Sequence, residues 1–189
     1  KEEGMGLADC AVMYRINAQS RALEEACIRY GTQYRIIGGV RFYQRREVKD
    51  VLAYLRILVN PYDEVSLARI INVPRRGIGT QTIDEVSRWA KSRNLPMYAA
   101  LQAMVAEAGD DGAQSPLAPR ALAMLERFVA LIDGLSREAE SAGAVGLVDM
   151  VLERAGYRRY LAEGENTEER LENIMELRGQ AAEAQETDP

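Results

Sequence analysis

Apolar residues recur at the spacing of an α-helix over most of this chain. Between residues 48 and 58 an apolar side chain occupies nearly every third or fourth position, and Asn60-Pro61 ends the stripe. Similar stripes follow, separated by turns and by a polar loop at residues 109–116. The pattern predicts a mainly α fold, with further helices near residues 65–71, 81–91, 96–104, 119–140, 147–155 and 167–183.

The first 37 residues have a different pattern. Residues 11–14 and 34–37 are short apolar runs, each predicted to be a strand, and helical spacing between them ends at Gly31. A strand–helix–strand unit of this length is normally parallel and right-handed. Because two strands do not make a stable sheet alone, we expect their other strands to lie elsewhere, or their edges to pair with a second copy.

Gly38 and Gly39 lie where the two patterns meet. Adjacent glycines bend easily, so the pair is predicted to be a hinge or a domain boundary. A plain turn leaving the second predicted strand is the competing interpretation.

Charge is unevenly distributed along the chain, whose net charge is −5. Residues 29–56 hold seven basic and two acidic residues, and residues 69–93 hold six basic and two acidic residues. Residues 137–189, by contrast, hold six basic and thirteen acidic residues. A basic front half and an acidic back half indicate a directional electrostatic surface. For the last helices, solvated acidic faces are the simpler explanation.

The sequence lacks the residues of the common catalytic sites. It contains no histidine, which excludes Ser-His and Cys-His catalysis and histidine-based metal sites. No glycine-rich loop is followed by Lys-Ser or Lys-Thr, so no P-loop for a nucleoside triphosphate is present. We expect no catalytic residue, metal ligand or cofactor within these residues.

The two cysteines and the hydropathy pattern indicate the cellular compartment of the chain. Cys10 and Cys27 lie in apolar runs and are predicted to be buried free thiols of a reducing cytoplasm. No apolar stretch approaches the roughly 20 residues of a membrane helix, and the first six residues carry no secretory signal. We expect a cytoplasmic chain without a membrane partner, and interpret its start without Met as that of a piece of a longer protein.

Residues 75–80, Arg-Arg-Gly-Ile-Gly-Thr, are the most informative local feature. Gly-Ile-Gly permits a tight turn with exposed amides, and Thr80 is predicted to cap a helix over residues 81–91. A helix start beside Arg75 and Arg76 is suited to an anion, and a nucleic-acid phosphate would be held there without sequence readout. An ordinary helix–helix turn is the competing interpretation.

Other polar residues could add phosphate contacts. Arg15 and Asn17 follow the first predicted strand, at the carboxyl end where open α/β sheets bind ligands. Arg41 follows the glycine pair. Lys49 and Arg56 are about two helical turns apart and so project from a similar face.

Four blocks, in order and closely spaced, resemble UvrD/PcrA/Rep-type superfamily 1 DNA helicases. They are residues 11–21, 34–43, 47–56 and 71–79, and residues 170–177 are also similar to that family. The resemblance covers nearly the whole chain and is weakest at residues 108–115 and after residue 180. It implies that residues 1–38 are a piece of the RecA-like motor domain 2A and residues 39–189 most of the helical domain 2B, joined at the Gly38-Gly39 hinge.

The resemblance also implies roles for individual residues. Single-stranded DNA would be held by Arg15, Asn17 and Arg41. The Gly-Ile-Gly turn matches a family element that grips duplex phosphates, and one 2B helix matches one that faces the duplex. The implied duplex contacts are Lys49, Arg56, Arg75, Arg76, Gly77, Ile78, Gly79, Thr80 and Thr82.

The implied function is that of a fragment of an ATP-dependent 3′-to-5′ DNA helicase in repair and replication. ATP and Mg would belong to the parent protein, because the family's ATPase motifs are missing here. The implied partners are duplex and single-stranded DNA, the remaining helicase domains and repair proteins. A nuclease-fused member of the wider family is also compatible with these residues. The acidic back half favours an alternative, a protein-interaction or autoregulatory module without direct DNA binding.

Overall fold

The computed structural model describes residues 6–16, 19–36, 42–108 and 116–187, which are mainly helical. Two short 3₁₀ helices, η1 (Leu7–Asp9) and η3 (Phe42–Gln44), precede α1 and α2 respectively. The α-helices are α1 (Ser20–Arg29), α2 (Arg46–Val59), α3 (Glu64–Ile70), α4 (Thr80–Arg93), α5 (Met97–Ala108), α6 (Pro119–Ala139), α7 (Ala144–Arg154), α8 (Tyr157–Ala162) and α9 (Thr167–Thr187).

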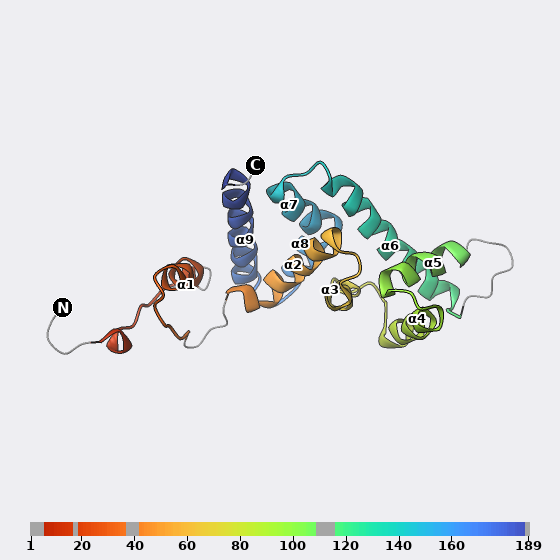
Figure 1. The fold of residues 1–189 in the computed structure, drawn as a ribbon, viewed down its shortest axis with the longest axis horizontal. Coiled ribbons are helices and arrows are strands. Elements are labelled where there is room, and N and C mark those ends of the chain that lie inside the picture. The colour runs from red at the N-terminus through yellow and green to blue at the C-terminus, as the bar shows by residue number, and fades with distance from the viewer. Residues whose placement is uncertain (1–5, 17–18, 37–41, 109–115, 188–189) are drawn as a thin grey trace.

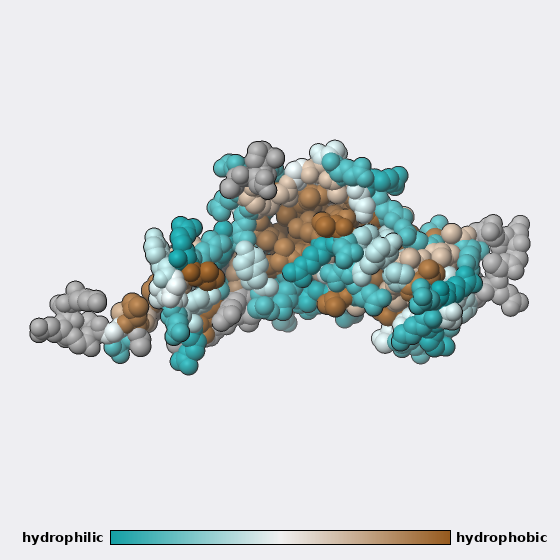
Figure 2. All heavy atoms as spheres, in the orientation of Figure 1, coloured by the Kyte–Doolittle hydropathy of each residue, from teal (hydrophilic) through white to brown (hydrophobic). Residues whose placement is uncertain are grey.

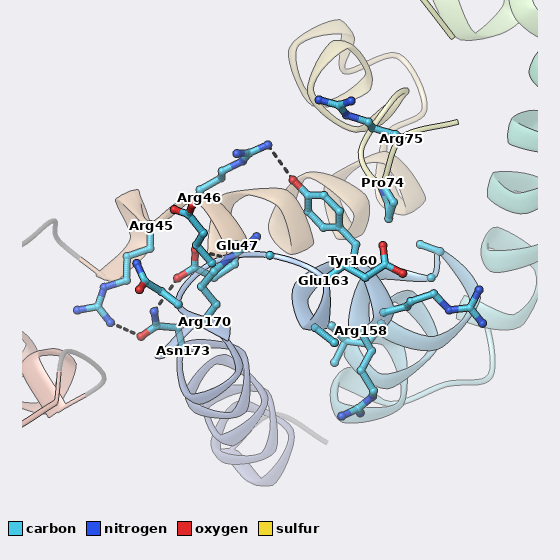
Figure 3. A pocket seen from close by; sticks show the side chains of 18 of the residues that line it. Arg45, Arg46, Glu47, Pro74, Arg75, Arg158, Tyr160, Glu163, Arg170 and Asn173 are labelled. Atoms are coloured by element: carbon cyan, nitrogen blue, oxygen red, sulfur yellow. Dashed lines mark hydrogen bonds and ion pairs between the residues drawn. The ribbon is translucent and has the colours of Figure 1, made fainter. Parts of the chain in front are cut away.

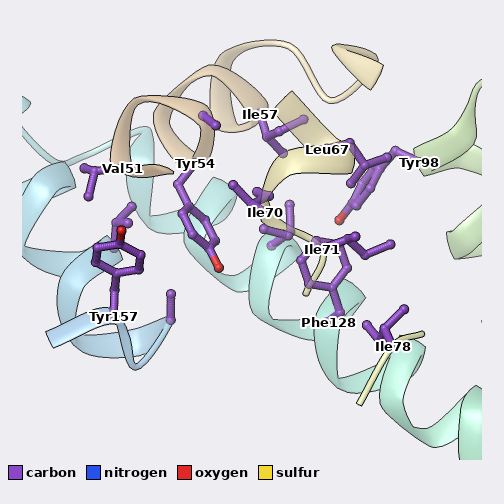
Figure 4. Packing of buried hydrophobic residues seen from close by; sticks show 14 of the residues in the cluster. Val51, Tyr54, Ile57, Leu67, Ile70, Ile71, Ile78, Tyr98, Phe128 and Tyr157 are labelled. Carbon is purple, nitrogen blue, oxygen red and sulfur yellow. The ribbon is translucent and has the colours of Figure 1, made fainter. Parts of the chain in front are cut away.

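Helix α2 lies at the centre of the helical body and contacts α3, α6, α7 and α9 (Figure 1). Its apolar stripe brings Tyr54 and Ile57 against Ile70 of α3 and Phe128 of α6, and all four side chains are fully buried (Figure 4). Burying an Ile or Phe side chain stabilises the fold by about 1.5–3 kcal/mol. This core holds the α3–α4 connection in a fixed position.

The remaining helices extend the body in two directions. Helices α4, α5 and α6 pack in sequence at one end, whereas α7 contacts both α8 and α9 nearer the middle. Helix α8 was not predicted from the sequence, because its six residues carry no complete apolar period. It begins after Gly156, which has a φ of 70°. None of the helices in the described ranges is both long and apolar enough to cross a membrane.

The predicted strands do not form. Residues 11–14 and 34–36 are irregular, and no strand occurs anywhere in the described ranges. Without a neighbouring strand there is no partner for their backbone groups, and Val12 and Met13 are 69% and 95% exposed. Figure 2 shows hydrophobic side chains at the surface of this end of the molecule. The strand–helix–strand interpretation of this segment is therefore wrong for the described residues.

The cysteines lie in the same segment and are not buried as predicted. Both are free thiols, but Cys10 is exposed and Cys27 is partly exposed. The apolar runs around them suggested a core, whereas this part of the chain has no layer packed over it.

Polar contacts attach α1 to the helical body. Arg21, whose side chain is 11% exposed, forms ion pairs with Glu176 and Glu183 of α9 and with Glu25 of its own helix. Nearby, the buried Arg45 donates to Ser20 Oγ at the start of α1, at 2.9 Å. These contacts place α1 beside α9.

Candidate nucleic-acid interface

The turn between α3 and α4 is anchored by Ile78. This side chain is 1% exposed and joins the main core cluster, whereas Gly77 and Gly79 on either side are exposed. Gly77 has a φ of 79°, a conformation that residues with a Cβ adopt only with strain. The Gly-Ile-Gly sequence therefore buries one side chain and leaves its flanking backbone at the surface.

Helix α4 begins one residue earlier than predicted. Gly79 is the N-cap and Thr80 is the first helical residue, so Thr80 does not cap the helix as expected. Glycine has no side chain to accept from the first-turn amides, and no side-chain cap is formed. Helix α4 thus presents uncapped N–H groups beside an exposed turn, which is a geometry suited to an anion.

Arg76 points into the protein. Its Nη1 donates to the carbonyl of Ile70 at 2.9 Å and also contacts the carbonyl of Pro74, and its Nη2 donates to Tyr54 Oη and contacts the carbonyl of Ala155. Its guanidinium also lies 5.5 Å from the ring centroid of Phe128. These contacts occupy the side chain, so the structure gives Arg76 an internal role in holding the turn.

Arg75, next to it, is exposed. No hydrogen bond, ion pair or ring contact joins its guanidinium to any other residue that the structure describes. The two arginines that the sequence treats alike are therefore separated, with one built into the core and one available to a ligand.

Arg75 lies on the lining of an open groove of 1780 Å³. We call this the Arg75 groove; it is bounded by residues 44–47, residues 74–76, the end of α7, helix α8 with the connection after it, and the start of α9. Figure 3 shows Arg45, Arg170 and Asn173 gathered at one end and Arg75 at another. Three further arginines, Arg46, Arg158 and Arg159, line it and were not predicted as contacts from the sequence. The sequence signals available were the adjacent pairs Arg45-Arg46 and Arg158-Arg159.

A buried polar network supports the groove. The carboxylate of Asp50, 2% exposed, pairs with Arg69 at 2.7 Å and accepts from Tyr157 Oη at 2.8 Å. Burial raises the pKa of Asp50, and the hydrogen bond from Tyr157 and the charge of Arg69 oppose that rise. Burial, with the charge of Asp50, raises the pKa of Tyr157. This network joins α2, α3 and α8 and so fixes the side of the groove that α8 forms.

The other predicted contacts lie at separate places. On α2, Arg56 is exposed and Lys49 is partly exposed, and neither lines the Arg75 groove. Thr82 is partly exposed in the first turn of α4. Arg15 is exposed, and its backbone N–H donates to Gln19 Oε1 at 3.1 Å.

Four predicted residues lie outside the described ranges. They are Asn17 and Arg41, assigned to single-stranded DNA, and the hinge glycines Gly38 and Gly39.

Comparison with known proteins identifies the family. Residues 1–115, more than half of the chain, match the UvrD-like helicase C-terminal domain. The chain belongs to this family. It is 39% identical over 179 residues to DNA helicase II of Escherichia coli (strain K12) and 42% identical over 178 residues to DNA helicase II of Haemophilus influenzae. It is also 40% identical over 192 residues to the ATP-dependent DNA helicase PcrA of Staphylococcus aureus (strain Mu50).

The alignments cover nearly all of this chain but only a small part of each relative. The alignments include 94%, 93% and 100% of this chain, but only 24%, 24% and 25% of the respective relatives. The chain thus spans about a quarter of the length of these UvrD-like helicases. Family membership confirms the resemblance.

Proposed function

We propose that this chain acts as the duplex-holding part of an ATP-dependent 3′-to-5′ DNA helicase of repair and replication. Its relatives are named as DNA helicases, and the chain corresponds to a quarter of their length. ATP and Mg would act in other parts of such a protein. In this proposal residues 39–189 form the helical 2B domain, residues 1–38 belong to the motor domain 2A, and Gly38-Gly39 is the hinge between them.

The observation that carries the proposal is the exposed, uncapped start of α4 beside Arg75, which pairs with no residue that the structure describes. Phosphate oxygens would accept from the first-turn amides while Arg75 supplies a charge, so the backbone is held without sequence readout. Arg76 would act by fixing the turn. Lys49, Arg56 and Thr82 would add duplex contacts, and Arg15, Asn17 and Arg41 would contact a single strand.

Substitution of Gly79→Ser tests the role of the amides. A Cβ at Gly79 meets no atom within 4 Å, so serine fits and can accept from the α4 amides. We expect the free energy of unfolding to stay the same or rise by a few tenths of a kcal/mol, while affinity for duplex DNA falls. Urea denaturation and fluorescence anisotropy with a labelled duplex measure the two effects. Unchanged DNA affinity in a folded Gly79→Ser variant would mean that the turn is only structural.

Substitution of Arg75→Gln tests the charge. We expect weaker binding by a similar factor for duplexes of different sequence, because phosphate contacts carry no sequence information. With about six phosphates contacted, the logarithm of affinity should fall against the logarithm of salt concentration with a slope of about −5. Arg120→Gln, which removes an exposed charge at the start of α6, is the matched control. A sequence-dependent loss would contradict this mode of binding.

The second candidate is a protein-interaction or autoregulatory module. Val59, Tyr62 and Val65 are 88%, 61% and 82% exposed around the α2–α3 connection, which favours a protein contact there. A salt titration with a fork-shaped duplex separates the candidates. A folded chain with no detectable, salt-dependent binding would favour the interaction module.

A further inference from the structure

We propose that Arg159 is a second phosphate contact and that the DNA backbone meeting the Gly-Ile-Gly turn continues along the Arg75 groove to α8. This inference rests on the proposed function. It adds a contact about which the sequence resemblance implies nothing.

Arg75 and Arg159 are the two exposed guanidiniums of the groove lining that have no partner in the described part of the chain. The neighbouring Arg158 is different, because its Nε pairs with Glu153 at 2.6 Å. Arg45 and Arg76 are held by internal hydrogen bonds. The two free charges come from segments far apart in the sequence, so only the fold brings them to one groove.

Two more arginines strengthen the positive side of the groove. Arg46 is 65% exposed; its Nη2 donates to Tyr160 Oη at 2.8 Å and its Nε lies 4.0 Å from the carboxylate of Asp50, which leaves Nη1 available (Figure 3). Arg170 lies 5.5 Å from the ring centroid of Tyr160, and its Nε is 4.0 Å from the carboxylate of Glu47. Its Nη2 is buried without a hydrogen-bond partner in the described ranges. A buried N–H group without a partner costs free energy, so a hydrogen bond from it to a phosphate oxygen would be favourable.

Part of the groove lining is acidic, and Glu163 lies one helical turn after Arg159, whose carbonyl accepts from its backbone N–H at 3.1 Å. Glu163 and Glu165, in the connection between α8 and α9, are exposed and line the groove without a counter-ion among the residues described. A phosphate chain is attracted to the arginines and repelled by these carboxylates. We therefore expect the DNA backbone to pass close to Arg75 and Arg159 and to avoid residues 163–165.

The size of the groove favours a polymer over a small anion. Its 1780 Å³ exceeds the roughly 300–1,000 Å³ typical of small-molecule sites, and it is open to solvent. Because Arg75 belongs both to this groove and to the proposed duplex contact, a DNA backbone accounts for both. An acidic protein segment is the competing occupant, and the experiment below distinguishes it.

The test compares Arg159→Gln with Arg127→Gln in the 189-residue chain. Arg127 is exposed on α6, has no hydrogen-bond or ion-pair partner in the described ranges and lies outside the groove lining. Anisotropy titrations with a mixed-sequence duplex are run at several salt concentrations. We expect Arg159→Gln to weaken binding about two- to fivefold relative to Arg127→Gln. It should also make the salt slope shallower by about 0.9, the value for one phosphate.

Removal of two carboxylates from the groove lining provides the converse test. Glu163→Gln with Glu165→Gln should tighten duplex binding more than Glu140→Gln with Glu186→Gln, which removes two exposed carboxylates outside the groove. Equal effects of the two pairs would contradict a path bounded by residues 163–165.

The outcomes separate this inference from the proposed function. If Arg75→Gln weakens DNA binding but Arg159→Gln behaves like Arg127→Gln, the inference fails and the proposed function stands. If the wild-type chain binds no duplex, both fail. If a polyglutamate peptide binds and Arg159→Gln weakens only that binding, the groove is a peptide site and the inference is overturned.

Discussion

The guanidinium of Arg76 serves four oxygens of the protein. Three are the carbonyl oxygens of Ile70, Pro74 and Ala155, and the fourth is the hydroxyl of Tyr54. These acceptors come from α2, the end of α3, the connection that follows it and the C-cap of α7. A single side chain therefore ties the Gly-Ile-Gly turn to three parts of the core, and Arg75 remains free because Arg76 takes this role.

Replacement of Arg76 by methionine should destabilise the protein by about 2–4 kcal/mol. The loss comes from charge-assisted hydrogen bonds and from acceptors left without a donor, rather than from lost volume. Urea denaturation followed by circular dichroism measures it. Arg75→Met, at the exposed neighbour, should change the free energy of unfolding by less than about 0.5 kcal/mol. Equal effects at the two positions would contradict the internal role of Arg76.

At the scale of elements, helices α7 and α9 are joined by an ion pair. Arg178 of α9 donates from Nε and Nη2 to the two carboxylate oxygens of Asp149 on α7, at 2.8 and 2.9 Å. The hydrogen bonds from Arg178 lower the pKa of Asp149, although burial acts in the opposite direction. Both side chains are more than a third exposed, so solvent screens the pair and its contribution is small.

The stability that this pair adds should depend on pH. Because the pKa of Asp149 is lower in the folded state than in the unfolded state, the contribution is present above the ordinary aspartate pKa and is lost as the pH falls through the lowered value. Asp149→Asn should cost about 0.5–1 kcal/mol at neutral pH and nothing in strong acid. Urea denaturation over a pH series measures this. Asp84→Asn, at an exposed carboxylate of α4, should show no such convergence with the wild type.

At the scale of the whole molecule, the N-terminal segment is held to the helical body by polar contacts rather than by apolar packing. Several large apolar side chains of the segment are exposed, including Met13, Ile28 and Tyr30, whereas its contacts with α9 are made by Arg21. The apolar surface between α1 and the body therefore contributes little to holding them together. Ion pairs with partly exposed glutamates are weak individually.

Substitution of Arg21→Gln should remove the ion pairs between α1 and α9 and loosen this attachment, with the Arg45–Ser20 hydrogen bond remaining, while the helical body stays folded. We expect a larger radius of gyration by small-angle X-ray scattering and a change of less than about 1 kcal/mol in the free energy of unfolding. Arg29→Gln, an exposed and unpaired position on α1, is the control. A cooperative loss of the whole fold would show instead that α1 is integral to the core.

The sequence by itself determined the helices and the family. Helical periodicity is a local property, so it located α1 to α7 and α9, and the ordered blocks identified the UvrD-like family. It also located the Gly-Ile-Gly turn, because the local backbone conformation at residue 77 favours glycine. The predicted DNA contacts and the two-domain division stay predictions.

Only the tertiary structure decided which charges are available. Arg75 and Arg76 are adjacent and chemically alike, and long-range contacts with α2 and α7 turn one inward. The groove that joins Arg75 with Arg159 exists because the buried network around Asp50 packs α8 against α2. The predicted strands do not form in the described ranges, because a strand needs partner strands that the local sequence does not supply. Periodicity reports on neighbours along the chain, whereas burial and sites depend on neighbours in space.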